Sequence, residues 1–270
     1  MSKPRIVGIG GMGNRTRALL SARAKYGEIE AIWAASTAVH GAQWGDVFEP
    51  LEGVTFIPAG NGHAHELDKD QWHYDVMTSN PVEDAPDGWT RGYRDVRPRP
   101  ALLEMIDKLI ANMGGPHSYV AIHARRLDHA EHAPTFGHFT TNEELLAFVD
   151  QAANVHTAIY VATDDPGTLE WFRSKRDRVF ANRTPERVSG YEIRPGTLAD
   201  AVVDMFVCVG AAAFMGSWMS SYSETIGLLR CGGAPDGGFV PRLHMQSADA
   251  EWFRGRPDRA EAILSGEPLP

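Results

Sequence analysis

Two adjacent arginines are the residues of this chain best suited to hold an anion. Arg125 and Arg126 follow an apolar, strand-like run at 118–123, and the carboxylate of Asp128 comes shortly after them. His123 and Arg125 are two residues apart, so at the end of a strand their side chains point to one face. Because guanidinium groups bind phosphate oxygens bidentately, the segment is typical of a pyrophosphate site. The alternative is a cluster of ion pairs on a surface loop.

A glycine-rich turn follows the first apolar run. The segment Gly8-Ile-Gly-Gly-Met-Gly13 matches the pattern G-x-G-x-x-G between a predicted strand and a predicted helix, which favours a dinucleotide-binding turn. That interpretation also needs an acidic residue at the end of the second strand, where residues 33–36 read Trp-Ala-Ala-Ser. Arg15 and Arg17 fall in the first turn of the helix, where a bound anion would offset their unfavourable position in the helix dipole. The alternative is a pair of solvated surface arginines.

Two more polar segments lie at the ends of predicted strands. Pro166 suits the first position of a helix, so Asp165 is expected to cap that helix, and Asp164 is placed to meet a hydroxyl or amine of a ligand. Residues 216–224 read Gly-Ser-Trp-Met-Ser-Ser-Tyr-Ser-Glu and precede another helix. Serine hydroxyls and the N–H groups of a helix N-terminus form an anion site without a metal. Simple helix capping is the alternative, and it needs only one serine.

The histidines and cysteines do not form a recognisable metal site. Histidines gather in two loop-like stretches, at His63, His65 and His73 and at His129, His132 and His138. They lack a matching carboxylate framework, and the spacing of Asp68-Lys-Asp70 has no strand end beside it, so we expect no metal. The two cysteines, Cys208 and Cys231, lie in segments that look buried or helical. This excludes a disulfide framework and a cysteine-based zinc site, and it favours a reducing cytosol.

Strands and helices alternate along the chain, and they must position these residues. In the first half, residues 5–10 and 29–35 are predicted strands around a helix at 14–26 with Asn14 as its N-cap, which makes a parallel βαβ unit. Short strands are expected at 54–57 and 74–78, and a helix at 101–113 behind Pro100.

The second half repeats the alternation more clearly. Predicted strands occupy residues 118–123, 157–163, 178–180 and 212–216, and predicted helices occupy 142–153, 166–173, 198–209 and 221–229, with Thr141 as one N-cap. Ligands of such sheets bind outside the carboxyl ends of the strands. The polar segments described above fall mostly at those ends.

Length and charge set further limits. The 270 residues allow two compact domains, and the break in composition at Arg97-Pro-Arg-Pro100 places the boundary between 1–98 and 99–270. A net charge of −9 opposes nonspecific binding of nucleic acid. The longest apolar stretch, 201–219, is interrupted by Asp204, Gly210 and Gly216, and is therefore core and not a membrane span. With no signal segment at the N-terminus, we expect a cytoplasmic protein.

Four segments, in this order, resemble motifs of the superfamily of fucosyltransferases that use GDP-fucose. That group includes α1,6-fucosyltransferases, among them the rhizobial nodulation type, and protein O-fucosyltransferases. The segments are Gly11-Met-Gly-Asn-Arg15, residues 120–128, residues 159–166, and a looser set made of Val203-Asp204, residues 214–217 and Ser220-Ser221. The resemblance implies an α/β fold of the GT-B type, in which two Rossmann-like domains with mostly parallel sheets face each other across a cleft. Residues 1–98 would form the acceptor side and residues 99–270 would bind the donor.

The resemblance also implies roles for individual residues. Arg125 and Arg126 would hold the diphosphate, with further phosphate contacts from Ser220 and Ser221. His123 and Asp204 would lie near the guanine and ribose, and the turn Gly13-Asn14-Arg15 would close on the donor from the other side. The four residues Arg15, Arg17, Arg125 and Arg126 would then form a local positive spot on an acidic protein.

The implied chemistry is a metal-independent, inverting transfer in which an acceptor hydroxyl displaces GDP in one step. No cofactor is expected, because the GDP-sugar is a co-substrate. Glu131 and Asp128 are the candidates for the general base, with His129 and His132 behind them.

Two alternatives and the acceptor stay open. The glycine turn supports an NAD(P)-dependent oxidoreductase, and the same fold supports a non-catalytic protein that binds a sugar or nucleotide. The irregular region 41–92 carries side chains that suit contacts with a sugar acceptor, namely Trp44, Trp72, Trp89, His63 and His65. Another GDP-sugar, such as GDP-mannose, fits a similar frame.

Overall fold

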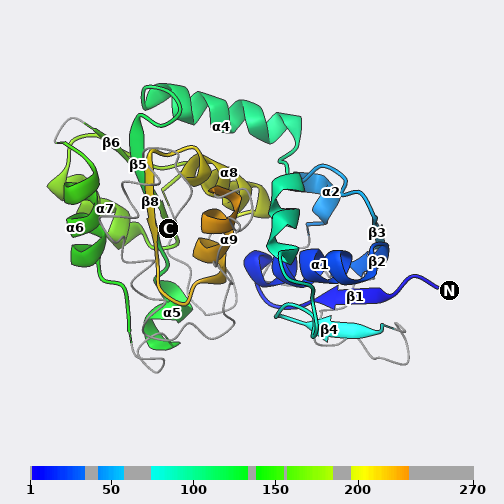
Figure 1. Ribbon diagram of the computed structural model, residues 1–270. Helices are drawn as coiled ribbons and strands as arrows, with labels where there is room; N and C mark the ends of the chain where they lie inside the picture. Colours follow the sequence, from blue (N-terminus) through cyan, green and yellow to red (C-terminus); the bar gives the residue numbers. More distant parts are fainter. Residues whose placement is uncertain are drawn as a thin grey trace.

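The computed structural model shows two four-stranded sheets joined by helices (Figure 1). It describes residues 2–33, 42–57, 74–132, 138–154, 157–184 and 196–230, without the side chains of residues 128, 131 and 132. The first sheet has the order β3-β2-β1-β4 and the second β7-β6-β5-β8, and all neighbouring strands are parallel. The α/β class and the two parallel sheets expected from the sequence are confirmed.

Both sheets follow one wiring pattern. The strands of the first are β1 (Arg5–Gly8), β2 (Ile29–Ile32), β3 (Val54–Ile57) and β4 (Val76–Thr78), and those of the second are β5 (Tyr119–Ala124), β6 (Ala158–Thr163), β7 (Val179–Phe180) and β8 (Ala213–Gly216). In each sheet the first strand is central, the next two extend to one side, and the fourth crosses to the other side. The chain order therefore reverses between β1 and β4 and between β5 and β8, and such switch points are where open α/β sheets bind ligands.

The main helices lie close to their predicted positions. They are α1 (Met12–Tyr26), α4 (Pro100–Asn112), α6 (Asn142–Ala152), α7 (Pro166–Lys175), α8 (Leu198–Val209) and α9 (Ser221–Arg230). The expected caps Thr141 and Asp165 accept hydrogen bonds from the backbone N–H groups of Glu144 and Thr168. The sequence analysis missed three short elements, α2 (Trp44–Val47), the 3-10 helix η3 (Trp89–Asp95) and α5 (Leu127–His132).

The predicted cap of the first helix is wrong. Helix α1 begins two residues earlier than expected, and its N-cap is Gly11, without a side-chain hydrogen bond. The reason lies in the turn before it, where Gly10 adopts φ +82 and sends the chain directly into the helix. Asn14 therefore lies inside the first turn, where its side-chain oxygen accepts a hydrogen bond from Arg17 Nη2 at 2.7 Å.

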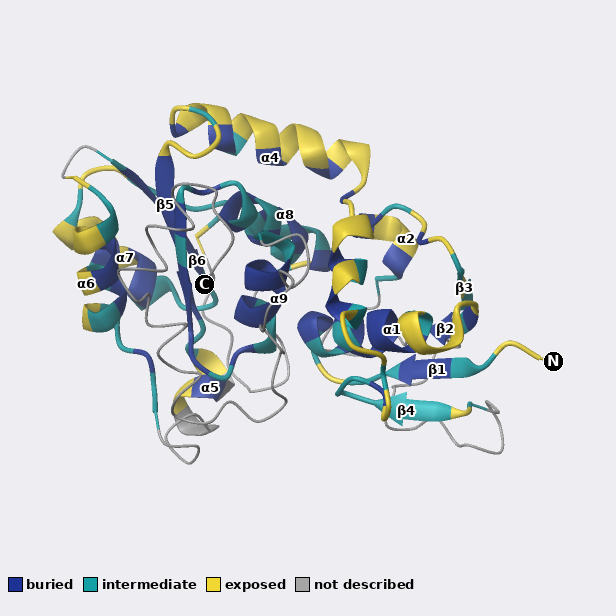
Figure 2. Cartoon of the chain, in the orientation of Figure 1, coloured by how far each residue is buried: buried dark blue, intermediate teal, exposed yellow. Residues whose placement is uncertain are grey.

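The second sheet is covered by helices on both faces, which explains why nearly every residue of β5 and β6 is buried (Figure 2). Val120 and Ile122 face a core made with α6 and α7, while Tyr119 and Ala121 face a second core made with α8. Strands buried on both faces read as continuous apolar runs, as the sequence does here.

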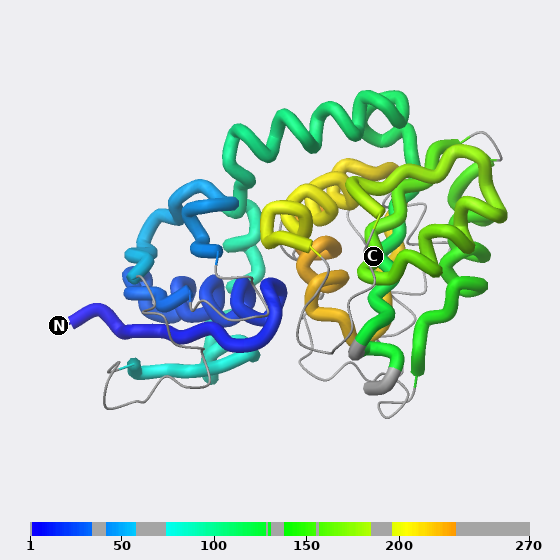
Figure 3. The backbone as a smooth tube through the Cα atoms, turned by 180° about the vertical axis from the view of Figure 1, so that it is seen from behind, coloured from blue at the N-terminus to red at the C-terminus, as the bar shows by residue number. Residues whose placement is uncertain are grey.

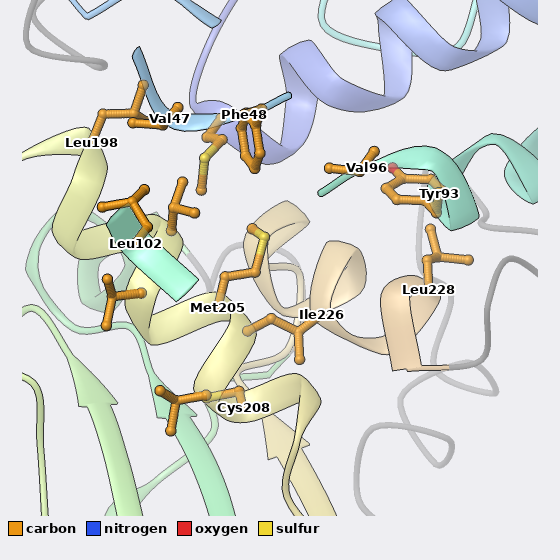
Figure 4. Packing of buried hydrophobic residues seen from close by; sticks show 14 of the residues in the cluster. Val47, Phe48, Tyr93, Val96, Leu102, Leu198, Met205, Cys208, Ile226 and Leu228 are labelled. Atoms are coloured by element: carbon orange, nitrogen blue, oxygen red, sulfur yellow. The ribbon is translucent and has the colours of Figure 1, made fainter. Parts of the chain in front are cut away.

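The second core continues without interruption into the first half of the molecule. Figure 4 shows side chains from both halves meeting in it: Val47, Phe48, Tyr93 and Val96 come from the first half, and Leu198, Met205, Cys208, Ile226 and Leu228 come from α8 and α9. Helix α4 runs from one half to the other and packs on α8 (Figures 1 and 3). The proposed boundary at residue 98 falls just before α4, and it stays a prediction.

A buried ion pair also joins the two halves. Arg17 of α1 donates a hydrogen bond from Nη1 to Glu224 Oε2 of α9 at 3.0 Å, and the two side chains are only 12% and 5% exposed. Burial raises the pKa of Glu224, and the neighbouring Arg17 guanidinium opposes that rise. Among the described residues, no helix combines the length and apolar character needed to cross a bilayer.

Candidate functional site

A pocket opens where the two halves meet, at the switch point between β5 and β8. Its wall is formed by the carboxyl ends of β5 and β6 with the residues that follow them, by part of the segment between β7 and α8, and by the N-terminal parts of three helices, α1, α8 and α9. The lining residues are Gly11, Met12, Gly13, His123, Arg125, Ala162, Thr163, Asp164, Arg183, Gly196, Thr197, Leu198, Asp200, Ala201, Asp204, Ser221 and Tyr222. Of the predicted site residues, the pocket therefore brings together Gly13, His123, Arg125, Asp164, Asp204 and Ser221.

Three helix N-termini converge on this pocket. Helix α1 enters with Met12 and Gly13, α8 with Leu198 behind its cap Thr197, and α9 with Ser221. The first N–H groups of a helix have no partner within the helix, and the helix dipole places positive potential there. Three such ends around one pocket favour a ligand that carries negative charge.

Glycine at position 13 allows two of these helix ends to touch. A Cβ atom on Gly13 would overlap the backbone carbonyl of Ser221 and lie 2.9 Å from the backbone nitrogen of Tyr222. Any larger residue would push α1 away from α9 and widen the pocket. The predicted participation of Gly13 thus has a steric basis, the close approach of two backbones.

His123 and Arg125 are held by two serines, Ser223 of α9 and Ser217 of the turn after β8. His123 Nδ1 lies 2.7 Å from Ser223 Oγ, and the imidazole packs on the ring of Tyr222 with centroids 4.6 Å apart. The backbone N–H of Arg125 donates to Ser217 Oγ at 2.8 Å, and that hydroxyl donates to the carbonyl of His123 at 3.1 Å. Ser217 therefore ties the end of β5 to the end of β8 and fixes the backbone from which Arg125 reaches the pocket.

The side chain of the neighbouring Arg126 points to other partners. Its guanidinium donates to the carbonyl of Thr140 at 2.9 Å and to Asn142 Oδ1 at 2.5 Å, and it lies 4.9 Å from the ring centroid of Phe139. Its backbone N–H donates to Asp164 Oδ1 at 2.8 Å, which orients a carboxylate that does line the pocket. Arg126 is not among the lining residues, and this geometry favours a structural role for it. Its contact with a phosphate stays a prediction.

Asp204 is a carboxyl group of the pocket with a strongly altered pKa. It lies on α8 and accepts a hydrogen bond from Tyr160 Oη at 2.5 Å. Burial raises its pKa to about 7, although the hydrogen bond from Tyr160 and the charge of Arg183 act in the opposite direction. The carboxyl therefore changes its charge near neutral pH while facing the pocket.

The first half contributes backbone to the pocket more than side chains. Arg15 is 1% exposed, donates from Nε to the carbonyl of Gly10 at 2.7 Å, and lies 5.8 Å from the ring centroid of Trp33. Burial lowers its pKa to about 10. Arg15 and Asn14 are outside the pocket lining, and the charge of Arg17 is already paired with Glu224. Of the four arginines in the expected positive spot, Arg125 lines the pocket, and the spot itself stays a prediction.

Several solved structures have the same fold. NodZ α1,6-fucosyltransferase soaked with GDP-fucose matches with a TM-score of 0.57 and 16% identity over 84% of this chain and 93% of that chain. NodZ from Bradyrhizobium matches with a TM-score of 0.56 and 16% identity over 85% and 94%. POFUT1 in complex with GDP-fucose matches with a TM-score of 0.52 and 13% identity over 84% and 94%. No protein-family model and no curated protein sequence matches the chain.

The chain has the GT-B fold of these fucosyltransferases. The likeness is at the level of the fold, as the low identities show, and it extends over both sheets of this chain. The GT-B architecture expected from the four motifs is confirmed.

Within this fucosyltransferase fold, the remaining predicted residues fall into two groups. Ser220 is 1% exposed and accepts a hydrogen bond from the backbone N–H of Ser223 at 3.4 Å, so it helps to begin α9 and lies outside the pocket lining. Asp128 and Glu131 belong to α5, directly after Arg126, but their side chains are outside the described residues. Trp72, His63 and His65 of the suggested acceptor region are also outside them.

The histidine stretches give a similar result. His129 Nε2 lies 2.6 Å from the carbonyl of Trp218, in a buried position. His138 lies 3.3 Å from Glu144. Among the residues that the structure describes, no group of three histidines, cysteines or carboxylates is arranged to hold a metal.

The sequence analysis missed part of the pocket wall. Arg183 and Gly196 come from the segment between β7 and α8, and Tyr222 comes from α9. One signal was available, since Thr197 and Asp200 form a capping box at the start of α8. It marks a helix N-terminus at a strand end of the sheet, and such ends gather around the ligand site of this fold.

Proposed function

We propose that this protein is a glycosyltransferase that moves a sugar, with fucose as the first candidate, from a GDP-sugar to an acceptor hydroxyl. The observation that carries the proposal is the pocket at the β5–β8 switch point, where Arg125 meets the N-termini of α1, α8 and α9. Solved proteins with this fold include NodZ soaked with GDP-fucose and POFUT1 in complex with GDP-fucose. A diphosphate is the ligand that this combination of one guanidinium and three helix ends suits best.

The same groups would assist the chemical step. As the bond between sugar and diphosphate breaks, negative charge develops on the leaving GDP. Ser217 fixes the backbone of Arg125, and the close contact at Gly13 fixes the starts of α1 and α9, so the N–H groups of these helix ends need no reorganisation during the reaction. We infer a metal-independent transfer because these residues can stabilise the diphosphate by themselves.

The acceptor hydroxyl would attack the anomeric carbon from the side opposite GDP, which inverts the configuration in one displacement. A general base must take the proton of that hydroxyl. Asp128 and Glu131 are the proposed candidates, because α5 follows directly on Arg125 and Arg126. His123 and Asp204 would lie toward the nucleoside, with residues 99–270 carrying most of the donor site and residues 1–98 the acceptor side.

Ligand-dependent melting tests the proposal. GDP at millimolar concentration, with a chelator present, should raise the melting temperature, because a ligand stabilises the folded state that it binds. A GDP-release assay with GDP-fucose and GDP-mannose should then identify the donor. If GDP left the melting temperature unchanged while NAD(H) raised it, the protein would be the oxidoreductase alternative, and the proposal would be wrong.

Substitution of Arg125 separates an enzyme from a binding protein. Arg125→Ala should lower GDP release by two orders of magnitude or more, on the order of the effect of one transition-state donor. Arg176→Ala is the matched control, because Arg176 pairs with Asp150 and neither residue lines the pocket. A wild-type protein that binds GDP tightly but releases none from any GDP-sugar would be a non-catalytic binder.

A further inference from the structure

The pocket has a second guanidinium, which lies in an acidic setting. Arg183 follows β7 and lines the pocket with a side chain that is 34% exposed. Two carboxyl groups of α8, Asp200 and Asp204, line the same pocket, and the charge of Arg183 acts on the pKa of Asp204. This wall of one cation and two acids differs from the wall around Arg125, where helix N-termini meet.

The acids decide what this wall can bind. A phosphate beside this wall would face the charge of Asp200, and also that of Asp204 whenever its carboxyl is ionised, so the diphosphate belongs at Arg125 and the α1 and α9 ends. A neutral group with both donors and acceptors suits the wall of Arg183 better. Guanine is such a group, because its O6 and N7 accept hydrogen bonds while its N1–H and N2 amino group donate them.

A neighbouring carboxylate orients the guanidinium of Arg183 without accepting a hydrogen bond from it. Its Nε lies 3.6 Å from Asp200 Oδ2, a charge pair beyond hydrogen-bond distance. Asp200 is itself fixed, since Oδ2 accepts from the backbone N–H and the hydroxyl of Thr197 at 2.9 and 2.8 Å. The planar fork of the guanidinium is therefore oriented by a rigid carboxylate and keeps N–H groups for a ligand.

A glycine makes room for this arrangement. Gly196 adopts φ +146, and a Cβ atom there would overlap Arg183 Nη2 and lie 2.9 Å from Cζ. Any side chain at position 196 would displace the guanidinium and strain the backbone just before the cap of α8. Glycine at this position thus serves the placement of Arg183.

We infer that Arg183 reads the O6 and N7 edge of the nucleotide base and makes the pocket selective for guanine over adenine, with Gly196 holding it in place. The inference rests on the proposed function, because it assigns the base of the same GDP-sugar donor. Arginine is the side chain whose fork matches O6 and N7 of guanine, whereas adenine presents an amino group in place of O6.

Calorimetric affinities for GDP, IDP and ADP test the inference. The wild-type protein should bind GDP and IDP, which share O6 and N7, at least about tenfold more tightly than ADP. Arg183→Ala should weaken GDP and IDP by about tenfold or more and leave ADP within about twofold, so that the selectivity is lost. Arg183→Lys should recover part of the selectivity, because lysine keeps a charged donor. The recovery should be incomplete, because lysine lacks the bidentate fork.

A glycine pair provides the second arm. Gly196→Ala should reproduce the loss of selectivity in a protein that still folds. Gly115→Ala is its matched control, because Gly115 also has a positive φ of +101 but no atom within 4 Å of the place where an added methyl group would lie. Gly115→Ala should keep the preference for GDP over ADP whatever it does to stability.

Each outcome has one meaning. A wild-type protein that binds neither GDP nor IDP overturns the proposed function and this inference together. A wild-type protein that binds GDP, with Arg183→Ala weakening GDP and ADP equally or weakening neither, overturns this inference alone. Equal weakening would make Arg183 a contact to the diphosphate or a structural residue.

Discussion

Arg125 and Arg126 are neighbours in sequence with different surroundings. Arg125 lines the pocket, whereas the guanidinium of Arg126 bonds to the carbonyl of Thr140 and the amide of Asn142. Successive residues at a strand end point to opposite faces, which is why an Arg-Arg pair cannot place both side chains on one ligand by direct extension.

This difference predicts opposite phenotypes. Arg126→Met should lower the free energy of unfolding by about 1 to 3 kcal/mol, because two partly buried acceptors lose their donors, and should change GDP affinity less than about threefold. Arg125→Met should do the reverse. Urea unfolding and calorimetric titration of both variants measure the two effects, and a large loss of GDP affinity in Arg126→Met at full stability would instead give Arg126 a ligand contact.

The raised pKa of Asp204 links stability to pH. Burial favours the protonated carboxyl in the folded state, with a pKa of about 7 against an ordinary value of 3.8. The folded protein therefore holds a proton that the unfolded chain releases, so this stabilisation is complete below about pH 4 and is lost as pH rises toward 7. Between these two pKa values, the free energy of unfolding should fall by at most about 1.4 kcal/mol per pH unit.

Asp204→Asn isolates this contribution, because Glu224 titrates in the same direction and remains in both proteins. Urea unfolding at pH 5 and pH 8 should show the variant gaining stability relative to the wild type as pH rises. Parallel pH profiles for the two proteins would mean that Asp204 is ionised throughout.

At the scale of the elements, α1 and α9 form the joint of the pocket. They touch through Gly13 at their N-terminal ends and through the Arg17–Glu224 ion pair further along. Removing one member of a buried pair leaves an uncompensated charge, whereas removing both leaves none.

A double-mutant cycle should reveal this coupling. Arg17→Met and Glu224→Gln should each lower the free energy of unfolding by about 3 to 5 kcal/mol, and the double variant should lose much less than the sum. Chemical unfolding of the four proteins measures the coupling energy. Additive losses would show that each side chain acts through other contacts, such as the bond of Arg17 to the carbonyl of Ser79.

The elements were largely predictable because their signals are local. The cap at Thr141 and the Asp165-Pro166 start each depend on a few consecutive residues, and both were predicted correctly. Gly11 gives no such signal, since a glycine cap leaves no side-chain oxygen to recognise. The short helix α2 begins with the buried Trp44, whose ring stacks on Phe56 with centroids 5.2 Å apart, and such long-range packing has no local pattern.

The pocket was only partly predictable for the same reason. His123, Arg125 and Asp164 lie at the carboxyl ends of β5 and β6, and Ser221 begins the helix after β8. The rule for parallel sheets collects such residues at one edge. Arg183 comes from a segment without a motif, and its place depends on Gly196, which follows much later in the chain. The diversion of Arg15 to Trp33 also needs a contact between separate elements.

At the scale of the whole molecule, the continuous core predicts one cooperative transition. The main apolar cluster contains Ile6 and Leu20 from the first half and Val202 and Ile226 from the second, so neither half can unfold without exposing the other. Differential scanning calorimetry should give a single peak whose calorimetric and van't Hoff enthalpies agree. Two peaks, only one of which moves with GDP, would show that the halves melt as separate units.

The absence of any side chain at Gly13 has a consequence for engineering. A hybrid enzyme could be built by recombining the acceptor half of one transferase with the donor half of another. Here the seam runs through a backbone contact between α1 and Ser221, a buried charge pair and a shared core. A productive recombinant would need to exchange α1, η3 and α9 together, so the natural crossover unit is this three-helix seam and not the chain division near residue 98.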